Sequence, residues 1–503
     1  MSIARSVSRC AAMGLMAAAA CSYDARVSSE PPAARAPQFA AVAPGRAANN
    51  RHIVSFSGSM PTDFATQVGA LGGKVLWVSP GSGLAAVSGL QGSAAAILAA
   101  KRGIQAVDAD ALLSLDMPRL ATEATAQAGG VQSNAAPAAA VRYPRQWNLR
   151  AVRADVAWAH GFLGSSSVSV FMLDSGIDPH HSDTQGRVDA TRSVDLLGTF
   201  DAQVVVGNDT IIVPFTEADT VQKYFPGAEV YTDLFFHGTH TGATVSSNAA
   251  RAAGVTSMTM LVAVKVCGYI NDCPFSSILN GVIYAADNRA DVINMSLGGA
   301  FTKAGNGRFV GLLNKTFNYA RSKGVTIVVS AGNAATDLDH DGNTYQTFCN
   351  TPAVICVAAT GPTSDANATT RNGPWTSVDA PAYYTNFGRS AINVAAPGGN
   401  SSFGPPLAAP AGRDVFVWAA CSQTSLIIGC FSSPNFIVGA QGTSMAAPHV
   451  AGTAALLVSI LGRNPGQIKA RIQQSADNVA GNGTTPFYGK GRLNVARAVG
   501  AIP

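Results

Sequence analysis

Six short apolar runs between residues 168 and 395 constrain the fold of this chain more than any other feature. They span residues 168–173, 261–266, 292–295, 325–329, 354–358 and 392–395. Near-continuous apolar runs of this length are typical of strands buried on both faces. Helical patterns lie between and after them, around 239–247, 276–286, 310–321 and 444–460. We therefore predict an α/β fold with a doubly wound, mostly parallel sheet, whose functional residues lie beyond the carboxyl ends of the strands.

The first 21 residues have the pattern of an export signal. Arg5 and Arg9 precede ten apolar residues, 11–20, a run too short to span a bilayer. The small residues that end this run suit a signal-peptidase site, whereas Cys21 suits attachment of a lipid anchor. Both alternatives place the protein outside the cytoplasm, either secreted or held at the cell envelope.

A chain of 503 residues is too long for one core, and changes of pattern divide it further. Residues 22–50 are a linker that becomes rich in Pro and Ala. Residues 51–116 show strand and helix patterns in the order β-α-β-β-α-β, which predicts a small α+β domain. Residues 117–145 have no apolar periodicity, so we expect an exposed and cleavable linker. Residues 146–503 contain the large sheet.

Six cysteines follow the signal region, and an even number in an exported chain predicts disulfides. Their spacings lack the Cys-x-x-Cys form of a zinc site. Each neighbouring pair brackets a short loop that contains turn-forming residues. Although six cysteines allow fifteen connectivities, we predict sequential pairing: Cys267 with Cys273, Cys349 with Cys356, and Cys421 with Cys430.

The charge pattern excludes one large class of partner. Charged residues make up only 13% of the chain, and the formal net charge of +5 is not gathered into any run of Lys or Arg. A protein that tracks phosphates needs such a basic stripe. We therefore expect no nucleic-acid partner.

Polar residues at the predicted strand and helix ends form a set that suits acyl transfer. Asp174 follows the first strand, while His237 and Ser444 each open a helix. A serine hydroxyl can attack a carbonyl, a histidine can take its proton, and a carboxylate can orient the imidazole. The order Asp, His, Ser excludes an α/β-hydrolase, which needs Ser, then an acid, then His.

Three sequence blocks resemble the subtilisin-like serine peptidases. They are Phe-Met-Leu-Asp-Ser-Gly-Ile-Asp at 171–178, His-Gly-Thr-His at 237–240 and Gly-Thr-Ser-Met-Ala-Ala-Pro-His at 442–449. The resemblance begins near residue 147 and extends to the end of the chain. It implies an exported endopeptidase that hydrolyses proteins or peptides through an acyl-enzyme, with residues 51–116 as an intramolecular inhibitory propeptide.

The resemblance also assigns roles to individual residues. It implies Asp174 as the orienting acid, His237 as the general base and Ser444 as the nucleophile. Asn333 is the implied second oxyanion donor, and the substrate backbone is expected to pair with Ser296, Leu297 and Gly298. We expect His181, His240 and His449 to make local hydrogen bonds only.

No metal site is expected, and no cofactor is required. Asp183 matches a family carboxylate that often binds calcium, but the Asn-rich loop that completes that site is missing. The loop 337–343 alternates carboxylates like a calcium loop, yet position twelve is Phe348 where an EF-hand has Glu. Calcium binding therefore stays open, as do two functional alternatives: an inactive binding protein, and a ligase that passes the acyl group to an amine.

Overall fold

The computed structural model describes residues 47–114, 119–123, 132–206, 209–269, 272–304, 306–346, 348–365, 373–401, 415–430 and 433–503. The predicted export signal and most of the linker 22–50 lie outside these residues.

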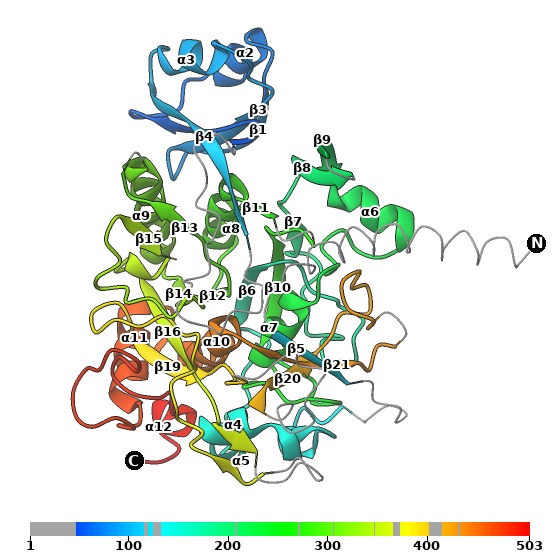
Figure 1. The fold of residues 1–503 in the computed structure, drawn as a ribbon, viewed down its shortest axis with the longest axis vertical. Helices are drawn as coiled ribbons and strands as arrows, with labels where there is room; N and C mark the ends of the chain where they lie inside the picture. The colour runs from blue at the N-terminus through cyan, green and yellow to red at the C-terminus, as the bar shows by residue number, and fades with distance from the viewer. Residues whose placement is uncertain are drawn as a thin grey trace, which may run out of the picture.

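A seven-stranded parallel sheet forms the centre of the large domain (Figure 1). Its order is β19-β16-β14-β12-β6-β10-β7. The strands are β6 (Ser169–Asp174), β7 (Val194–Asp195), β10 (Met260–Lys265), β12 (Val292–Met295), β14 (Thr326–Ser330), β16 (Val354–Thr360) and β19 (Val394–Pro397). All six apolar runs became strands of this sheet. The predicted doubly wound parallel sheet is confirmed.

Helices cover both faces of the sheet, as alternate residues of β6 show. Phe171 and Leu173 belong to a core cluster that includes residues of α8 (Phe275–Asp287) and α9 (Gly307–Ser322). Val170 and Met172 belong to a second cluster, with α10 (Thr443–Leu461), α11 (Pro465–Ser475) and α12 (Val495–Val499). Since successive side chains of a strand point to opposite faces, the two clusters are the two layers of one domain.

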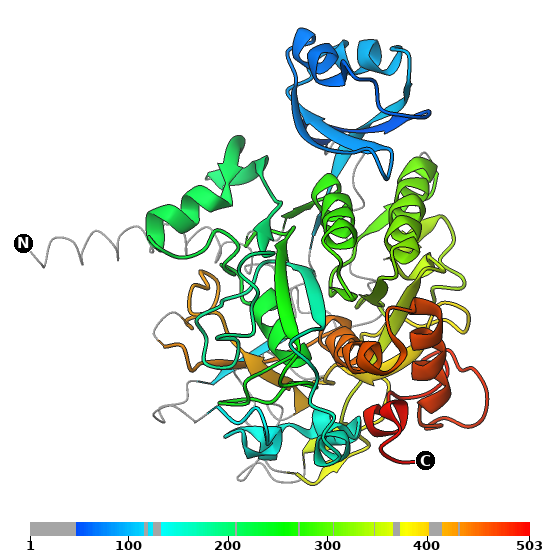
Figure 2. The same ribbon diagram turned by 180° about the vertical axis from the view of Figure 1, so that it is seen from behind.

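Among the described residues, the helix α10 alone is long and apolar enough to cross a membrane. However, 83% of its most apolar window is buried inside the protein. It is the central core helix of the large domain, beside α7 (His237–Val245) (Figures 1 and 2).

The N-terminal α+β domain has the predicted element order. It contains β1 (Ala47–Phe56), α2 (Phe64–Ala70), β2 (Lys74–Ser79), β3 (Leu84–Ser88), α3 (Ala94–Ala99) and β4 (Ile104–Ser114). The four strands are antiparallel, in the order β4-β1-β3-β2. Their apolar faces pack against Phe64, Val68 and Leu98 of the two helices. This domain lies at one end of the molecule, next to α8 and α9 (Figures 1 and 2).

The described residues of the stretch 117–145 include backbone pairing that the linker prediction did not anticipate. Within it, β5 (Arg119–Glu123) pairs with β21 (Ile437–Gln441), which itself pairs with β20 (Val417–Ala420). Further along, Arg142 donates its backbone N–H to the carbonyl oxygen of Arg251 at 2.8 Å. Backbone pairing of this kind does not require an apolar pattern, so hydrophobic periodicity could not predict it.

An ion pair of the small domain is buried at its contact with the large domain. Arg51 of β1 and Asp110 of β4 lie 3.4 Å apart and are almost completely buried against the large domain. Arg51 also donates to the carbonyl oxygen of Leu197 and to the hydroxyls of Ser276 and Ser277, at 3.2, 2.8 and 3.2 Å. Asp110 accepts the backbone N–H of Ser276, at the start of α8, at 2.8 Å.

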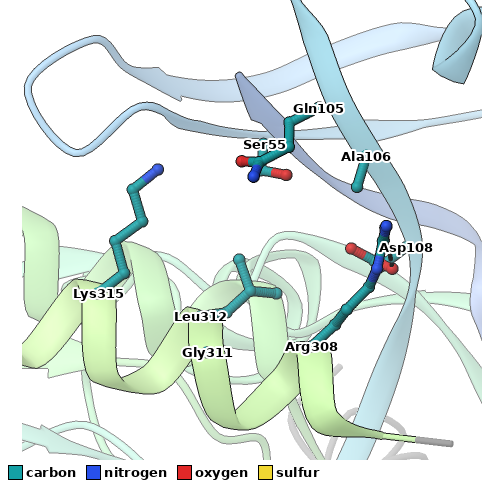
Figure 3. A pocket seen from close by; sticks show the side chains of 8 residues that line it. All are labelled: Ser55, Gln105, Ala106, Asp108, Arg308, Gly311, Leu312 and Lys315. Carbon is teal, nitrogen blue, oxygen red and sulfur yellow. Dashed lines mark hydrogen bonds and ion pairs between the residues drawn. The ribbon is translucent and has the colours of Figure 1, made fainter. Parts of the chain in front are cut away.

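The rest of this interface is less closely packed. A cavity of about 270 Å³ separates the sheet of the small domain from α9 (Figure 3). Arg308 reaches across it to Asp108 at 3.1 Å, and Lys315 donates to the carbonyl oxygen of Gly83 at 3.3 Å. Contacts that are partly open to water hold two domains together less firmly than a continuous apolar core.

All three predicted disulfides are present. Cys267 is bonded to Cys273, Cys349 to Cys356 and Cys421 to Cys430. The first closes a loop directly after β10, and the others close loops after β15 (Thr344–Gln346) and β20. Disulfides persist in oxidising compartments, so they indicate a location outside the cytoplasm.

Candidate active site

Asp174 and His237 form a fully buried pair. Asp174 is the last residue of β6 and His237 the first of α7, and neither side chain is exposed. Nδ1 of His237 donates to Oδ1 of Asp174 at 2.7 Å, while Thr241 and the backbone of Ser175 donate to the same carboxylate. The carboxylate therefore fixes the ring orientation and the tautomer of His237.

A second buried carboxylate, Asp233, organises the turn before His237. It accepts the backbone N–H groups of Phe235, Phe236 and Thr239 at 2.8–3.0 Å. It also accepts the hydroxyl of Ser175, which in turn accepts the N–H of Gly238. Burial raises the pKa of Asp233, and the charge of Asp174 adds to this rise.

This network holds an unusual backbone conformation. Phe236 has φ 136° and ψ −23°, a conformation that side-chain-bearing residues rarely adopt, immediately before His237. The hydrogen bonds to Asp233 keep this turn in place. Neither Asp233 nor Ser175 was predicted from the sequence as part of the site. Their positions, four residues before His237 and directly after Asp174, are the signal that could have revealed them.

Ser444 lies in the first turn of α10 and is tied to the strand end at Ser296. Its hydroxyl donates to the carbonyl oxygen of Ser296 at 3.0 Å, and the hydroxyl of Ser296 donates to the carbonyl oxygen of Ser444 at 2.7 Å. Asn294 donates to the Ser296 hydroxyl at 3.0 Å. These reciprocal bonds join the helix that carries Ser444 to the end of β12.

Asn333 lies directly beside this helix. Its Oδ1 accepts the backbone N–H and the hydroxyl of Thr443 at 2.8 and 2.9 Å, which fixes the orientation of the amide. A Cβ atom added to Gly442 would lie 3.6 Å from Nδ2 of Asn333 and 3.7 Å from the backbone nitrogen of Ser444. Both donors therefore flank a space that the glycine leaves open, as an oxyanion site requires.

The segment after Ser296 contacts the N-terminal domain. Leu113 of β4 packs on Gly299, where an added Cβ would come within 2.9 Å of the leucine side chain. On its other side, β4 pairs antiparallel with β11 (Asp272–Pro274), with Ser114 opposite Asp272. The end of β4 therefore lies at the edge where Ser296, Leu297 and Gly298 were expected to bind a substrate backbone.

The three further histidines named from the sequence make the hydrogen bonds that we predicted. His181 donates to the carbonyl oxygen of Phe436 at 2.7 Å, His240 to that of Val417 at 3.1 Å and His449 to that of Met445 at 2.9 Å. Burial lowers the pKa of His240 to about 3 and that of His449 to about 4. Both are therefore neutral at physiological pH.

The carboxylates at the two candidate calcium positions bind donors of the protein itself. Asp183 accepts the backbone N–H groups of Arg251 and Ala252 at 2.8 and 3.0 Å, so its oxygens already bind donors. In the acidic loop, Asp339 accepts N–H groups of Ser390 and Ala391, and Asp341 pairs with Lys303. The described residues contain no cluster of three or more His, Cys, Asp or Glu suited to a metal ion.

The fold and this site together define a subtilisin-like serine endopeptidase. Residues 165–491 match the model of the subtilase family, and the chain belongs to that family. Thermitase of Thermoactinomyces vulgaris is 29% identical over 358 residues, which cover 71% of this chain and 96% of thermitase. A subtilisin of Bacillus pumilus is 28% identical over 355 residues, which cover 70% of this chain and 98% of that protein.

Solved structures show the same fold. Fervidolysin from Fervidobacterium pennivorans, a keratinolytic enzyme related to subtilisin, matches with a TM-score of 0.63 and 21% identity, over 91% of this chain and 62% of that one. The epidermin leader peptide processing serine protease of Staphylococcus aureus matches with a TM-score of 0.63 and 18% identity, over 89% of this chain and 97% of that one. Both matches include more of this chain than its peptidase domain alone.

Proposed function

We propose that this protein is an exported serine endopeptidase in which Asp174, His237 and Ser444 form the catalytic triad. The observation that carries the proposal is the fully buried hydrogen bond between His237 Nδ1 and Asp174 Oδ1. A neutral imidazole held in this tautomer presents Nε2 as the base for a serine hydroxyl. The hydroxyl of Ser444 has to turn from the carbonyl oxygen of Ser296 toward that nitrogen.

The reaction follows from these positions. Ser444 Oγ attacks the carbonyl carbon of the scissile bond while His237 takes its proton, and the backbone N–H of Ser444 and Nδ2 of Asn333 stabilise the oxyanion. His237 then returns the proton to the leaving amine, which leaves an acyl group on Ser444. A water molecule, activated by His237, hydrolyses this ester and releases the acid.

The N-terminal domain acts as an inhibitory propeptide in this proposal. The end of β4 occupies the edge expected to bind the residues before the scissile bond, and β5 pairs with β21 on the other side, with Arg119 opposite Gln441, three residues before Ser444. Self-cleavage on the carboxyl side of β4, within the predicted linker 117–145, would convert the zymogen into the two-domain complex.

Export is supported by the three disulfides and by the signal-like N-terminus. The two alternatives for that N-terminus, secretion and a lipid anchor at Cys21, lead to different locations. Radiolabelled fatty acid fed to expressing cells separates them, because only an acylated Cys21 retains the label.

The central test is covalent labelling of the purified full-length protein by a fluorophosphonate. We expect the label on Ser444 and none on a Ser444→Ala protein, which should also remain at its unprocessed length. A Ser322→Ala protein, changed at an exposed serine of α9, serves as the matched control. Labelling elsewhere, or normal processing of Ser444→Ala expressed alone, would show that the assignment is wrong.

A further inference from the structure

The chain between β7 and α7 forms an elaboration beside the active site. It contains β8 (Thr199–Val206), β9 (Asp209–Thr216) and α6 (Glu217–Tyr224). No role for these residues was predicted from the sequence. Glu217, the first residue of α6, is only 1% exposed. A buried carboxylate is costly unless it is paired, so its partners indicate what it does.

Glu217 binds two groups at the base of the loop that follows β10. Its Oε1 lies 2.5 Å from Nζ of Lys265, and both side chains are fully buried. Its Oε2 accepts the backbone N–H of Tyr269 at 2.8 Å. Lys265 pairs in register with Asp174 on the neighbouring strand, and its Nζ also donates to the carbonyl oxygen of Thr232. Glu217 therefore links α6 to the sheet edge beside the triad.

The loop that Glu217 holds is part of the substrate edge. The Cys267–Cys273 disulfide closes it, and the N–H of Gly268 donates to the carbonyl oxygen of Asp272 across it at 2.9 Å. The carboxyl end of the loop is β11, which pairs with β4. The ring of Phe215, just before α6, lies 5.8 Å from the ring of Tyr269. A shift of Tyr269 would therefore also move β11, the strand that pairs with β4.

We propose that Glu217 is a positioning residue for substrate recognition upstream of the scissile bond, acting through the loop from Cys267 to Cys273. This inference rests on the proposed peptidase function. Glu217 itself contacts no substrate. The strand β11 pairs with Leu112, Leu113 and Ser114 of β4, and the cut proposed above falls on the carboxyl side of these residues. Only substrates that extend several residues to the amino side of the cut can reach β11.

Substrate length provides the test. For the self-processed enzyme, Glu217→Leu should raise KM about tenfold for a peptide with six residues before the cut, since the N–H of Tyr269 loses its charged acceptor. Hydrolysis of a single-residue ester should change less than about twofold, because that substrate does not reach β11. Glu217→Gln keeps an oxygen for Tyr269, so the increase in KM for the long peptide should be smaller.

Asp219→Ala is the matched control, since Asp219 is exposed on the same helix. Active sites are counted by fluorophosphonate titration, so misfolded Glu217→Leu molecules do not enter the kinetic constants. Equal losses on the ester and the long peptide, or no loss on either, would overturn the inference. Failure of the parent enzyme to hydrolyse the ester would instead refute the proposed peptidase function, which keeps the two failures distinct.

Discussion

At the scale of single residues, the buried carboxylates of Asp174 and Asp233 hold His237 in place. Neither carboxylate is exposed, and each accepts several N–H or O–H donors, which repays the cost of removing it from water. Asp174 orients His237 directly. Asp233 acts one step further away, because it fixes the turn from which His237 projects. His237 is thus held both through its ring and through its backbone.

We expect Asp233→Asn to lower kcat by about 10² with little change in KM, because a displacement of the base by about 1 Å costs this much. The asparagine brings an NH₂ group that faces N–H donors, so the turn cannot keep its geometry. Kinetics on a short ester measure the effect. Asp183→Asn is the matched control, since Asp183 is also buried and accepts backbone N–H groups, but beyond the far end of α7. A similar loss of kcat in both variants would contradict a specific role for Asp233.

At the scale of elements, hydrophobic periodicity predicted the buried helices and strands. It did not predict the strands that form through backbone pairing with a neighbour. The run 292–295 corresponds to β12 residue for residue, and α8 differs from its predicted range by one residue at each end. These elements are buried, so their composition carries the signal. In contrast, β5 and β11 exist because a neighbouring strand supplies hydrogen bonds. The site followed the same rule: motifs pointed to Asp174, His237 and Ser444, whereas no apolar pattern marks Asp233, which binds the N–H groups of its own turn, or Glu217, whose partner Lys265 lies on a distant strand.

The packing of α11 on the sheet predicts a pH dependence of stability. Nζ of Lys469 donates to the carbonyl oxygen of Val354, and burial lowers the pKa of Lys469 to about 8 from its ordinary value of 10.5, with a further contribution from Arg321. Between these values the unfolded chain binds more protons than the folded one, so the free energy of unfolding contributed by Lys469 rises with pH. Below pH 8 this gain is absent.

Urea unfolding between pH 7.5 and 10 checks this expectation, with both proteins carrying Ser444→Ala to prevent self-digestion. The Lys469→Met protein should lack the part of the rise that belongs to Lys469, whereas all other titrating groups contribute equally to both proteins. Parallel pH profiles for the two proteins would show that Lys469 is not held in the buried position.

At the scale of the whole molecule, the proposed propeptide role makes the contact between the two domains the step that controls activity. Self-cleavage alone would not separate the domains, since β4 pairs with β11, and Arg51 and Asp110 are buried against α8. The cavity beside α9 and the open pair between Arg308 and Asp108 contribute little to this contact. The buried ion pair should therefore control how slowly the N-terminal domain leaves.

Removing one member of the Arg51–Asp110 pair should weaken the contact between the domains more than removing both members. Arg51→Ala leaves the Asp110 carboxylate buried without its positive partner, which typically weakens a contact by roughly 10²-fold or more. The lag between self-cleavage and full peptidase activity should shorten accordingly. In Arg51→Ala/Asp110→Ala no buried charge is left, so much of the lag should return. Arg308→Ala should change the lag less than about twofold, because the Arg308 side chain is 62% exposed. Equal shortening by Arg51→Ala and Arg308→Ala would show that the buried pair has no special part in release.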